Sequence, residues 1–137
     1  MIFDAPDKEM PENPSVNGIV KPKADAPMTE VVATDTFTIR GEVPTQKQHT
    51  CYEDTTGQMR SGTWCSTPFE SELKPFPRNE MVHLIEGSVT LIDEDSVEHH
   101  FKAGDAFFIP MGTICSWQTT ENTWTFYSAF QPSEMTS

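Results

Sequence analysis

The chain has 137 residues, which is enough for one domain with a core of useful size. Its formal net charge is −12 with only 9 Lys and Arg, so nucleic acids and polyanions are unfavourable partners, because phosphate binding depends on clustered basic side chains. Acidic residues interrupt the amino-terminal segment, and no apolar run approaches the ~18 residues of a membrane span, so we expect a soluble, cytoplasmic protein that does not bind membranes.

Residues 1–28 carry five of the eleven prolines, among Asp, Glu, Lys and Asn. This composition buries too little apolar surface to order itself, so we expect an extended arm that packs on its own barrel or on a partner subunit. Such an arm favours a homodimer, in which strand edges pair or arms swap. The predicted organisation is an arm over residues 1–28, a barrel over 29–132 and a short tail over 133–137.

The remainder of the chain reads as a series of short strands. The strand-like runs are 31–32, 37–39, 48–52, 59–65, 81–85, 89–92, 97–101, 106–109, 115–119 and 124–130. Gly57 can adopt the positive φ of a hairpin turn between the third and fourth runs. The segment 67–78 contains Pro68, Pro75 and Pro77, so any strand in it is an edge strand or is interrupted. The pattern predicts an all-β barrel without internal repeats.

The three cysteines, Cys51, Cys65 and Cys115, are odd in number and show no Cys-x2-Cys spacing. They are therefore interpreted as free, buried thiols, and no disulfide framework is expected.

Two glycine-containing motifs lie in the second half of the chain. Glu80 and Gly87 enclose six residues, and residues 104–112 read Gly-Asp-Ala-Phe-Phe-Ile-Pro-Met-Gly. These spacings resemble the two sequence motifs of the cupins, which implies a jelly-roll, double-stranded β-barrel. The stretches 62–68, 80–87 and 117–127 are similar to a narrower branch that contains ureidoglycine aminohydrolase and the ethanolamine-utilisation cupins.

The resemblance also implies a place for a metal, because three histidines and a glutamate usually bind a divalent ion in cupins. Here the first motif has Lys74 and Phe76 at the histidine positions, or Leu73 and Pro75 in the alternative spacing, and the second motif has Cys115. Glu80 alone keeps its ligand type. We therefore predict no metal cofactor, because a site of useful affinity needs three or four protein ligands. A divalent metal (Mn, Fe, Zn or Ni) is the alternative.

Glu80 is the candidate catalytic acid/base or ligand anchor. Strand alternation turns it into the barrel on the same side as Val82 and Leu84, where desolvation would raise its pKa. A purely structural role, pairing with Lys74 or Arg78, is the other interpretation. The candidate ligand-binding residues are Trp64, Lys74, Phe76, Cys115, Trp117 and Tyr127, although aromatic residues in such positions are often simply core. His83 falls on the opposite face of its strand, towards sheet packing or a dimer interface.

Three functions remain open. The first is a metal-independent, small-molecule-binding cupin with a degenerate metal site and an unknown substrate. The second is a metal-dependent enzyme of the ureidoglycine aminohydrolase type, and the third is a non-catalytic dimeric assembly module with a fully packed barrel. Fold alone does not decide among them. Metal content and an open cavity that reaches Glu80 would distinguish them.

Overall fold

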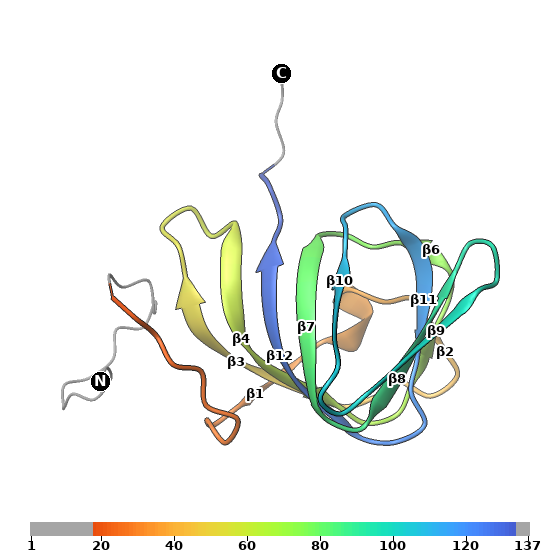
Figure 1. Ribbon diagram of the computed structural model, residues 1–137, viewed down its shortest axis with the longest axis horizontal. Coiled ribbons are helices and arrows are strands. Elements are labelled where there is room, and N and C mark those ends of the chain that lie inside the picture. Colours follow the sequence, from red (N-terminus) through yellow and green to blue (C-terminus); the bar gives the residue numbers. More distant parts are fainter. Residues whose placement is uncertain (1–17, 134–137) are drawn as a thin grey trace.

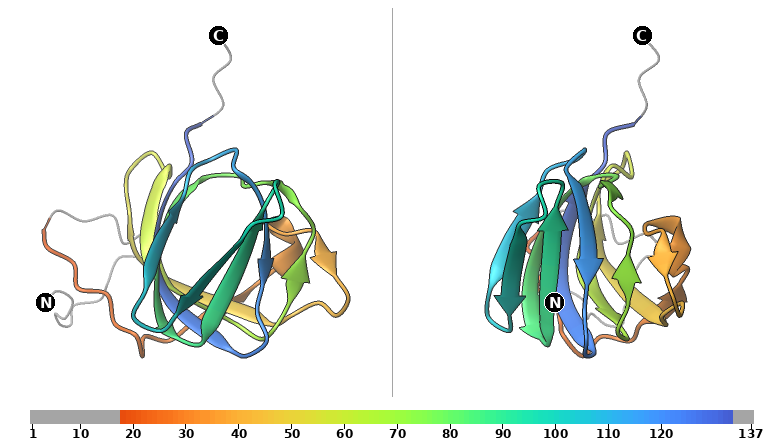
Figure 2. Two further views of the ribbon diagram at one scale, coloured as in Figure 1. Left: turned by 45° about the vertical axis from the view of Figure 1, so that its right-hand side comes forward. Right: turned by 90° about the vertical axis from the view of Figure 1, so that its right-hand side faces the viewer.

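Two antiparallel β-sheets face each other in the computed structural model, which describes residues 18–133 (Figures 1 and 2). The first sheet has the order β1 (Thr29–Val31), β3 (Gln46–Glu53), β4 (Met59–Ser66), β12 (Thr123–Phe130), β7 (Asn79–Glu86) and β10 (Ala106–Ile109). The second has the order β2 (Ile39–Arg40), β5 (Glu70–Ser71), β11 (Ile114–Gln118), β8 (Ser88–Asp93) and β9 (Glu98–Lys102), and β6 (Lys74–Pro75) also pairs with β11. The predicted all-β jelly-roll barrel is confirmed.

The strands agree with the sequence pattern at most places. The β3–β4 hairpin is present with Gly57 at φ 77°, and β10 has the predicted bounds. The proline-containing segment forms only the two-residue strands β5 and β6, which confirms that any strand in it is interrupted. The predicted domain boundaries at residues 28 and 132 stay a prediction, and residues 1–17 and 134–137 lie outside the described part of the chain.

One predicted strand, 37–39, is wrong at its start. Residues Ala33–Asp35 form a 3₁₀ turn, and β2 begins only at Ile39. The Phe37 ring instead packs into the barrel, with its centroid 4.9 Å from Phe69 and 5.6 Å from Trp117. Burial of the ring therefore outweighs the β-propensity of this short run, because propensity alone is a weak constraint.

The apolar core follows the alternation of the long strands. On β7, Val82 and Leu84 are 1% and 0% exposed and face the interior with Phe107 of β10. Trp117 of β11 enters the same cluster from the second sheet. The inward face predicted for Val82 and Leu84 of β7 is thus confirmed.

Gly87 connects β7 to β8 at a place where no side chain fits. Its φ is 87°, and a Cβ there would lie 2.3 Å from the carbonyl oxygen of Asn122. Both the left-handed backbone and the close approach require glycine. Gly87 is also the glycine that ends the first motif, separated from Glu80 by six residues.

Residues 18–28 lie against the outer face of the first sheet of their own chain (Figure 1). The indole of Trp124 donates a hydrogen bond to the Ala24 carbonyl (3.0 Å), and the Cys65 Sγ lies 3.6 Å from the Met28 Sδ. This part of the arm therefore packs on its own barrel. All three cysteines are free, as predicted, but each is half-buried and not fully buried as expected. Across residues 18–133, no helix has the length and apolar character needed to cross a membrane.

Candidate ligand-binding cavity in the barrel

A cavity of about 250 Å³ opens into the barrel beside Glu80. Its wall combines the inner faces of β3, β4, β7, β11 and β12 with the end of β1 and the 3₁₀ turn. Four of the six predicted ligand-binding residues line it: Trp64, Phe76, Trp117 and Tyr127. The Trp64 and Trp117 rings meet edge to face with centroids 5.7 Å apart, so one wall of the cavity is aromatic.

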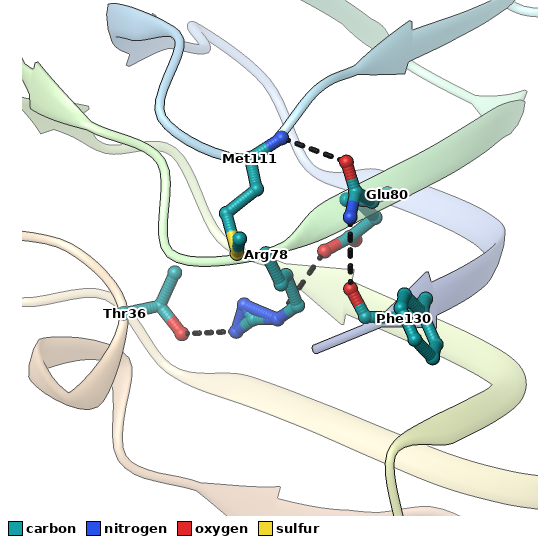
Figure 3. Close-up of polar contacts among 6 residues, drawn as sticks. Thr36, Arg78, Glu80, Met111 and Phe130 are labelled. Carbon is teal, nitrogen blue, oxygen red and sulfur yellow. Dashed lines mark hydrogen bonds and ion pairs between the residues drawn. The ribbon is translucent and has the colours of Figure 1, made fainter. Parts of the chain in front are cut away.

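Glu80 points inward near the start of β7 and its side chain is only 17% exposed. Arg78, two residues earlier, brings its Nε to 3.6 Å from the Glu80 Oε1 and donates from Nη2 to the Thr36 hydroxyl at 2.8 Å (Figure 3). Of the two partners considered for Glu80, the neighbour is therefore Arg78 and not Lys74. Lys74 instead donates to the Thr38 hydroxyl at 3.1 Å.

Burial raises the pKa of Glu80 to about 7, although the positive charges of Arg78 and Arg60 lower it. Desolvation is the larger effect, because the carboxylate loses water that two guanidinium groups do not fully replace. The side chain is thus poised to exchange a proton near neutral pH, as the hypothesis of a buried acid/base requires.

Asn79 holds the backbone next to Glu80. Its Oδ1 accepts a hydrogen bond from the Met111 amide at 2.9 Å, and its Nδ2 donates to the Phe130 carbonyl at 3.4 Å (Figure 3). The start of β7 is therefore tied both to the turn after β10 and to the end of β12. This cross-link positions Glu80 without contacting the cavity.

Two arginines also line the cavity: Arg60 was not predicted from the sequence, and Arg78 was considered only as a structural partner of Glu80. Alternation contains the signal for both, since Arg60 lies four residues before the inward Trp64 and Arg78 two residues before the inward Glu80. Arg78 also stacks over the Phe76 ring, with Cζ 5.6 Å from the centroid. An arginine held between an aromatic face and a carboxyl group is more pre-organised than a free surface arginine.

Three cavity residues carry buried polar atoms that find no hydrogen-bond partner within residues 18–133. These atoms are Arg78 Nη1, Trp117 Nε1 and Tyr127 Oη. Burial also raises the pKa of Tyr127, so that its hydroxyl keeps its proton. Buried polar groups are almost always paired in native proteins, so these atoms call for a water or a ligand in the cavity.

Lys74 and Cys115 are not brought together with Glu80. They border a separate crevice of about 10 Å³ where β6 pairs with β11, and Cys115 stands opposite Lys74 in that pairing. The rings of Phe37, Phe76 and Trp117 border both spaces. Burial, with a contribution from Asp93, raises the pKa of the Cys115 thiol, which therefore resembles a small core residue and not an activated nucleophile.

The residues at the cupin metal position do not fit a divalent cation. Glu80 is the one acidic or imidazole ligand kept from the family pattern, and two guanidinium groups lie beside it. Within the described residues no three His, Cys, Asp or Glu side chains converge. A metal cation next to Arg60 and Arg78 would be repelled by both guanidinium groups, so these side chains favour a ligand with a negative charge.

The histidines lie away from the cavity. His83 is on the outer face of β7, as predicted, with its ring stacked 6.3 Å from that of Phe126. His99 contacts Asp93 at 3.0 Å and His100 contacts Glu98 at 3.3 Å, both on exposed side chains of the second sheet.

The architecture and the two glycine-motif spacings define a small cupin barrel, and comparison with known proteins supports this class. The family sequence model of the EutQ-like cupin domain matches residues 53–127, so the chain belongs to this family. No curated protein sequence matches the chain.

Several solved structures share the fold. A protein of unknown function in the DUF861 family from Pseudomonas syringae pv. tomato is 28% identical, with a TM-score of 0.72 over 78% of this chain and 46% of its own length. This chain thus spans about half of that protein. The EutQ protein of Clostridium difficile is 14% identical (TM-score 0.53, 74% of this chain and 80% of its own). A putative ethanolamine utilization protein Q from Salmonella typhimurium is 18% identical (TM-score 0.55, 85% and 100%), and these two likenesses show the fold alone.

Proposed function

We propose that the chain is a metal-independent, small-molecule-binding cupin whose ligand occupies the barrel cavity beside Glu80. The observation that carries this proposal is a space of about 250 Å³ lined by the largely buried Glu80 carboxyl group and by buried polar atoms that have no partner among residues 18–133. A typical pocket for a drug-sized ligand is about 300–1,000 Å³, so the ligand is small.

In this proposal Glu80 is the anchor of the ligand, or its acid/base where the ligand is a substrate. A carboxyl group with a pKa near 7 is present in both protonation states at neutral pH, which is the condition for efficient proton transfer. The aromatic faces of Trp64, Phe76 and Trp117 suit a planar or apolar ligand body.

The two other functions have less support. A metal-dependent enzyme of the ureidoglycine aminohydrolase type requires a metal beside two arginines. An assembly module with a fully packed barrel is disfavoured by the cavity itself. Elemental analysis of purified protein tests the first: we expect far less than one equivalent of transition metal, and a stoichiometric metal bound through Glu80 would overturn the proposal.

A pair of leucine substitutions tests the place of binding. Ala129 faces the cavity opposite Glu80, whereas Ala106 is exposed on the outer face of the same sheet. We expect small molecules that raise the melting temperature of the wild type to lose this effect in Ala129→Leu and to keep it in Ala106→Leu. The reverse result would place the ligand on the outer face and contradict the proposal.

We also propose that the protein is a homodimer and that it is located in the cytoplasm, as predicted from the sequence. Support for a homodimer comes from the outer face of the first sheet, where the paired residues Met81 and Phe108 are 47% and 53% exposed. Apolar neighbours on an exposed sheet face are typical of an interface. Light scattering should give twice the 15.4 kDa chain mass at micromolar concentration, and the monomer mass would contradict the dimer. Fractionation of cells would test the location.

A further inference from the structure

The unpartnered atoms of the cavity are hydrogen-bond donors. Arg78 directs Nε towards Glu80 and Nη2 to Thr36, while its Nη1 is buried without a partner in the described chain. The indole nitrogen of Trp117 can only donate, and the Tyr127 hydroxyl can donate as well. A ligand that satisfies the Arg78 and Trp117 donors needs acceptor lone pairs. An ionised carboxylate is acceptor-only and accepts from arginine through two oxygens.

The charges around the cavity also favour an anion. The titratable or charged groups that line it near Glu80 are Arg78 before β7, Arg60 on β4, Tyr127 on β12 and Asp35 on the 3₁₀ turn. Neutral Gln46 and Gln48 line it from β3. When Glu80 is protonated, the two guanidinium groups outnumber the one remaining carboxylate, so the interior is locally positive although the whole chain carries −12.

The walls restrict the rest of the ligand. The space is about 250 Å³, and Phe37, Phe76 and the two tryptophans supply flat apolar surfaces. A planar body therefore buries well there, whereas a large or multiply charged ligand does not.

We propose that the cavity binds small aromatic monocarboxylates, with the carboxylate held by Arg78 and Arg60 and with Glu80 in its protonated form. This inference rests on the proposed function and specifies its ligand class. An anion beside an ionised Glu80 would be repelled, so above neutral pH each ligand ion brings one proton from solvent onto the Glu80 carboxylate. No covalent bond changes.

Calorimetric titration of the full chain with benzoate and phenylacetate, each compared with its neutral amide, tests the ligand class. The amide keeps the size and the ring but replaces the charge and adds donors. At pH 6 we expect each carboxylate to bind at least about tenfold more tightly than its amide, the size of one charge-assisted hydrogen bond. Affinity for the carboxylate should fall by up to about tenfold per pH unit above pH 7, with uptake of about one proton at pH 8.

Variants test the role of Glu80 as the proton carrier separately from the role of Arg78 as the carboxylate-binding group. Glu80→Gln should make carboxylate affinity independent of pH between 6 and 9, because the amide cannot ionise. Arg78→Met keeps the apolar stem and should weaken carboxylate binding without weakening amide binding, and Arg78→Lys should restore part of the loss. Arg40→Met, an exposed residue on β2, is the matched control and should change neither. The wild-type comparison of acid with amide needs no variant, so it holds even where a variant does not fold.

The outcomes are distinguishable. Equal binding of acids and amides, abolished in both cases by Ala129→Leu, would overturn the carboxylate class and leave the proposed function intact. Tighter binding of inorganic phosphate than of benzoate would also overturn it. Carboxylate affinity without pH dependence in the wild type would refute the protonated Glu80. If neither acids, amides nor a broader set of small molecules bind in the cavity, the proposed function fails as well.

Discussion

The two ends of the barrel interior differ sharply although the same strands run through both. At one end Leu84 and Val82 of β7 pack against Phe107, whose ring centroid is 4.4 Å from that of Phe101. At the other end β7 carries Glu80, and its partner on β12 is the small Ala129. Alternation turns all these residues inward, so it is the size and polarity of the opposing side chains that decides whether the space is filled or open.

The comparison of the two ends shows that residues that stabilise the fold and residues that suit ligand binding lie at different ends of the same strand, β7. The packed end contributes apolar burial, whereas the open end contains a desolvated carboxyl group and buried donors that have no partner among residues 18–133, each of which costs free energy. Such a cost is typical of a binding site, because the ligand restores the missing interactions.

The largest effect is expected from Leu84→Ala at the packed end. The side chain is fully buried, so its truncation should lower the free energy of unfolding by about 2–5 kcal/mol through lost burial and a new cavity. Urea unfolding measures this. Met81→Ala on the outer face of the same strand is the control, and at 47% exposure it should cost much less. Equal losses would mean that the outer face is as well packed as the core.

Glu80 at the open end should make the free energy of unfolding depend on pH. The folded chain holds a proton on Glu80 that the unfolded chain releases between its ordinary pKa of 4.5 and about 7. The folded state therefore binds more protons in this window, and the Glu80 contribution to stability is present below pH 4.5 and is lost as pH rises to 7. Relative to wild type, Glu80→Gln should gain stability across the window, on the order of 2–3 kcal/mol.

Denaturation of both proteins at pH 5, 6, 7 and 8 measures this difference. Glu42→Gln, an exposed residue, serves as the control and should run parallel to wild type. A wild type and a Glu80→Gln variant with parallel pH profiles would show that Glu80 is not desolvated.

The turn that closes the packed end should tolerate a side chain less well than another glycine turn. Gly87→Ala and Gly104→Ala both place alanine at a positive φ, 87° and 97°, which costs about 1–3 kcal/mol. Only at Gly87 would the new Cβ also meet a carbonyl oxygen, 2.3 Å away, whereas nothing lies within 4 Å at Gly104. The melting temperature should therefore fall further for Gly87→Ala than for Gly104→Ala. Equal decreases would show that the contact with the carbonyl oxygen adds nothing to the cost.

The smallest effects are expected at Lys74 and Cys115. Both border the minor crevice and neither lines the main cavity, so Lys74→Met and Cys115→Ala should leave the benzoate affinity at pH 6 unchanged. Calorimetric titration measures it, with Arg78→Met as the variant that does weaken binding. A comparable loss in Cys115→Ala would mean that the two spaces communicate in solution.

The sequence by itself determined the fold and the direction of Glu80. The glycine-motif spacings and the strand alternation are both local properties of the chain. The glycines lie where the backbone needs a positive φ, and the alternation follows because side chains on a strand point to opposite faces in turn. The rise in the pKa of Glu80 was also predictable in direction, since a carboxyl group inside an aromatic barrel must lose water.

Tertiary structure decided which of the predicted residues meet Glu80 and which further side chains join them. Arg60, Trp117 and Tyr127 come from β4, β11 and β12, and the Phe37 ring enters from a segment that is not a strand. Sequence spacing aligned Cys115 and Lys74 with the family metal ligands, yet β6 and β11 pair at the smaller crevice. Which inward side chains meet depends on sheet pairing and on how rings fill the volume between two sheets, and these are long-range contacts that no local pattern encodes.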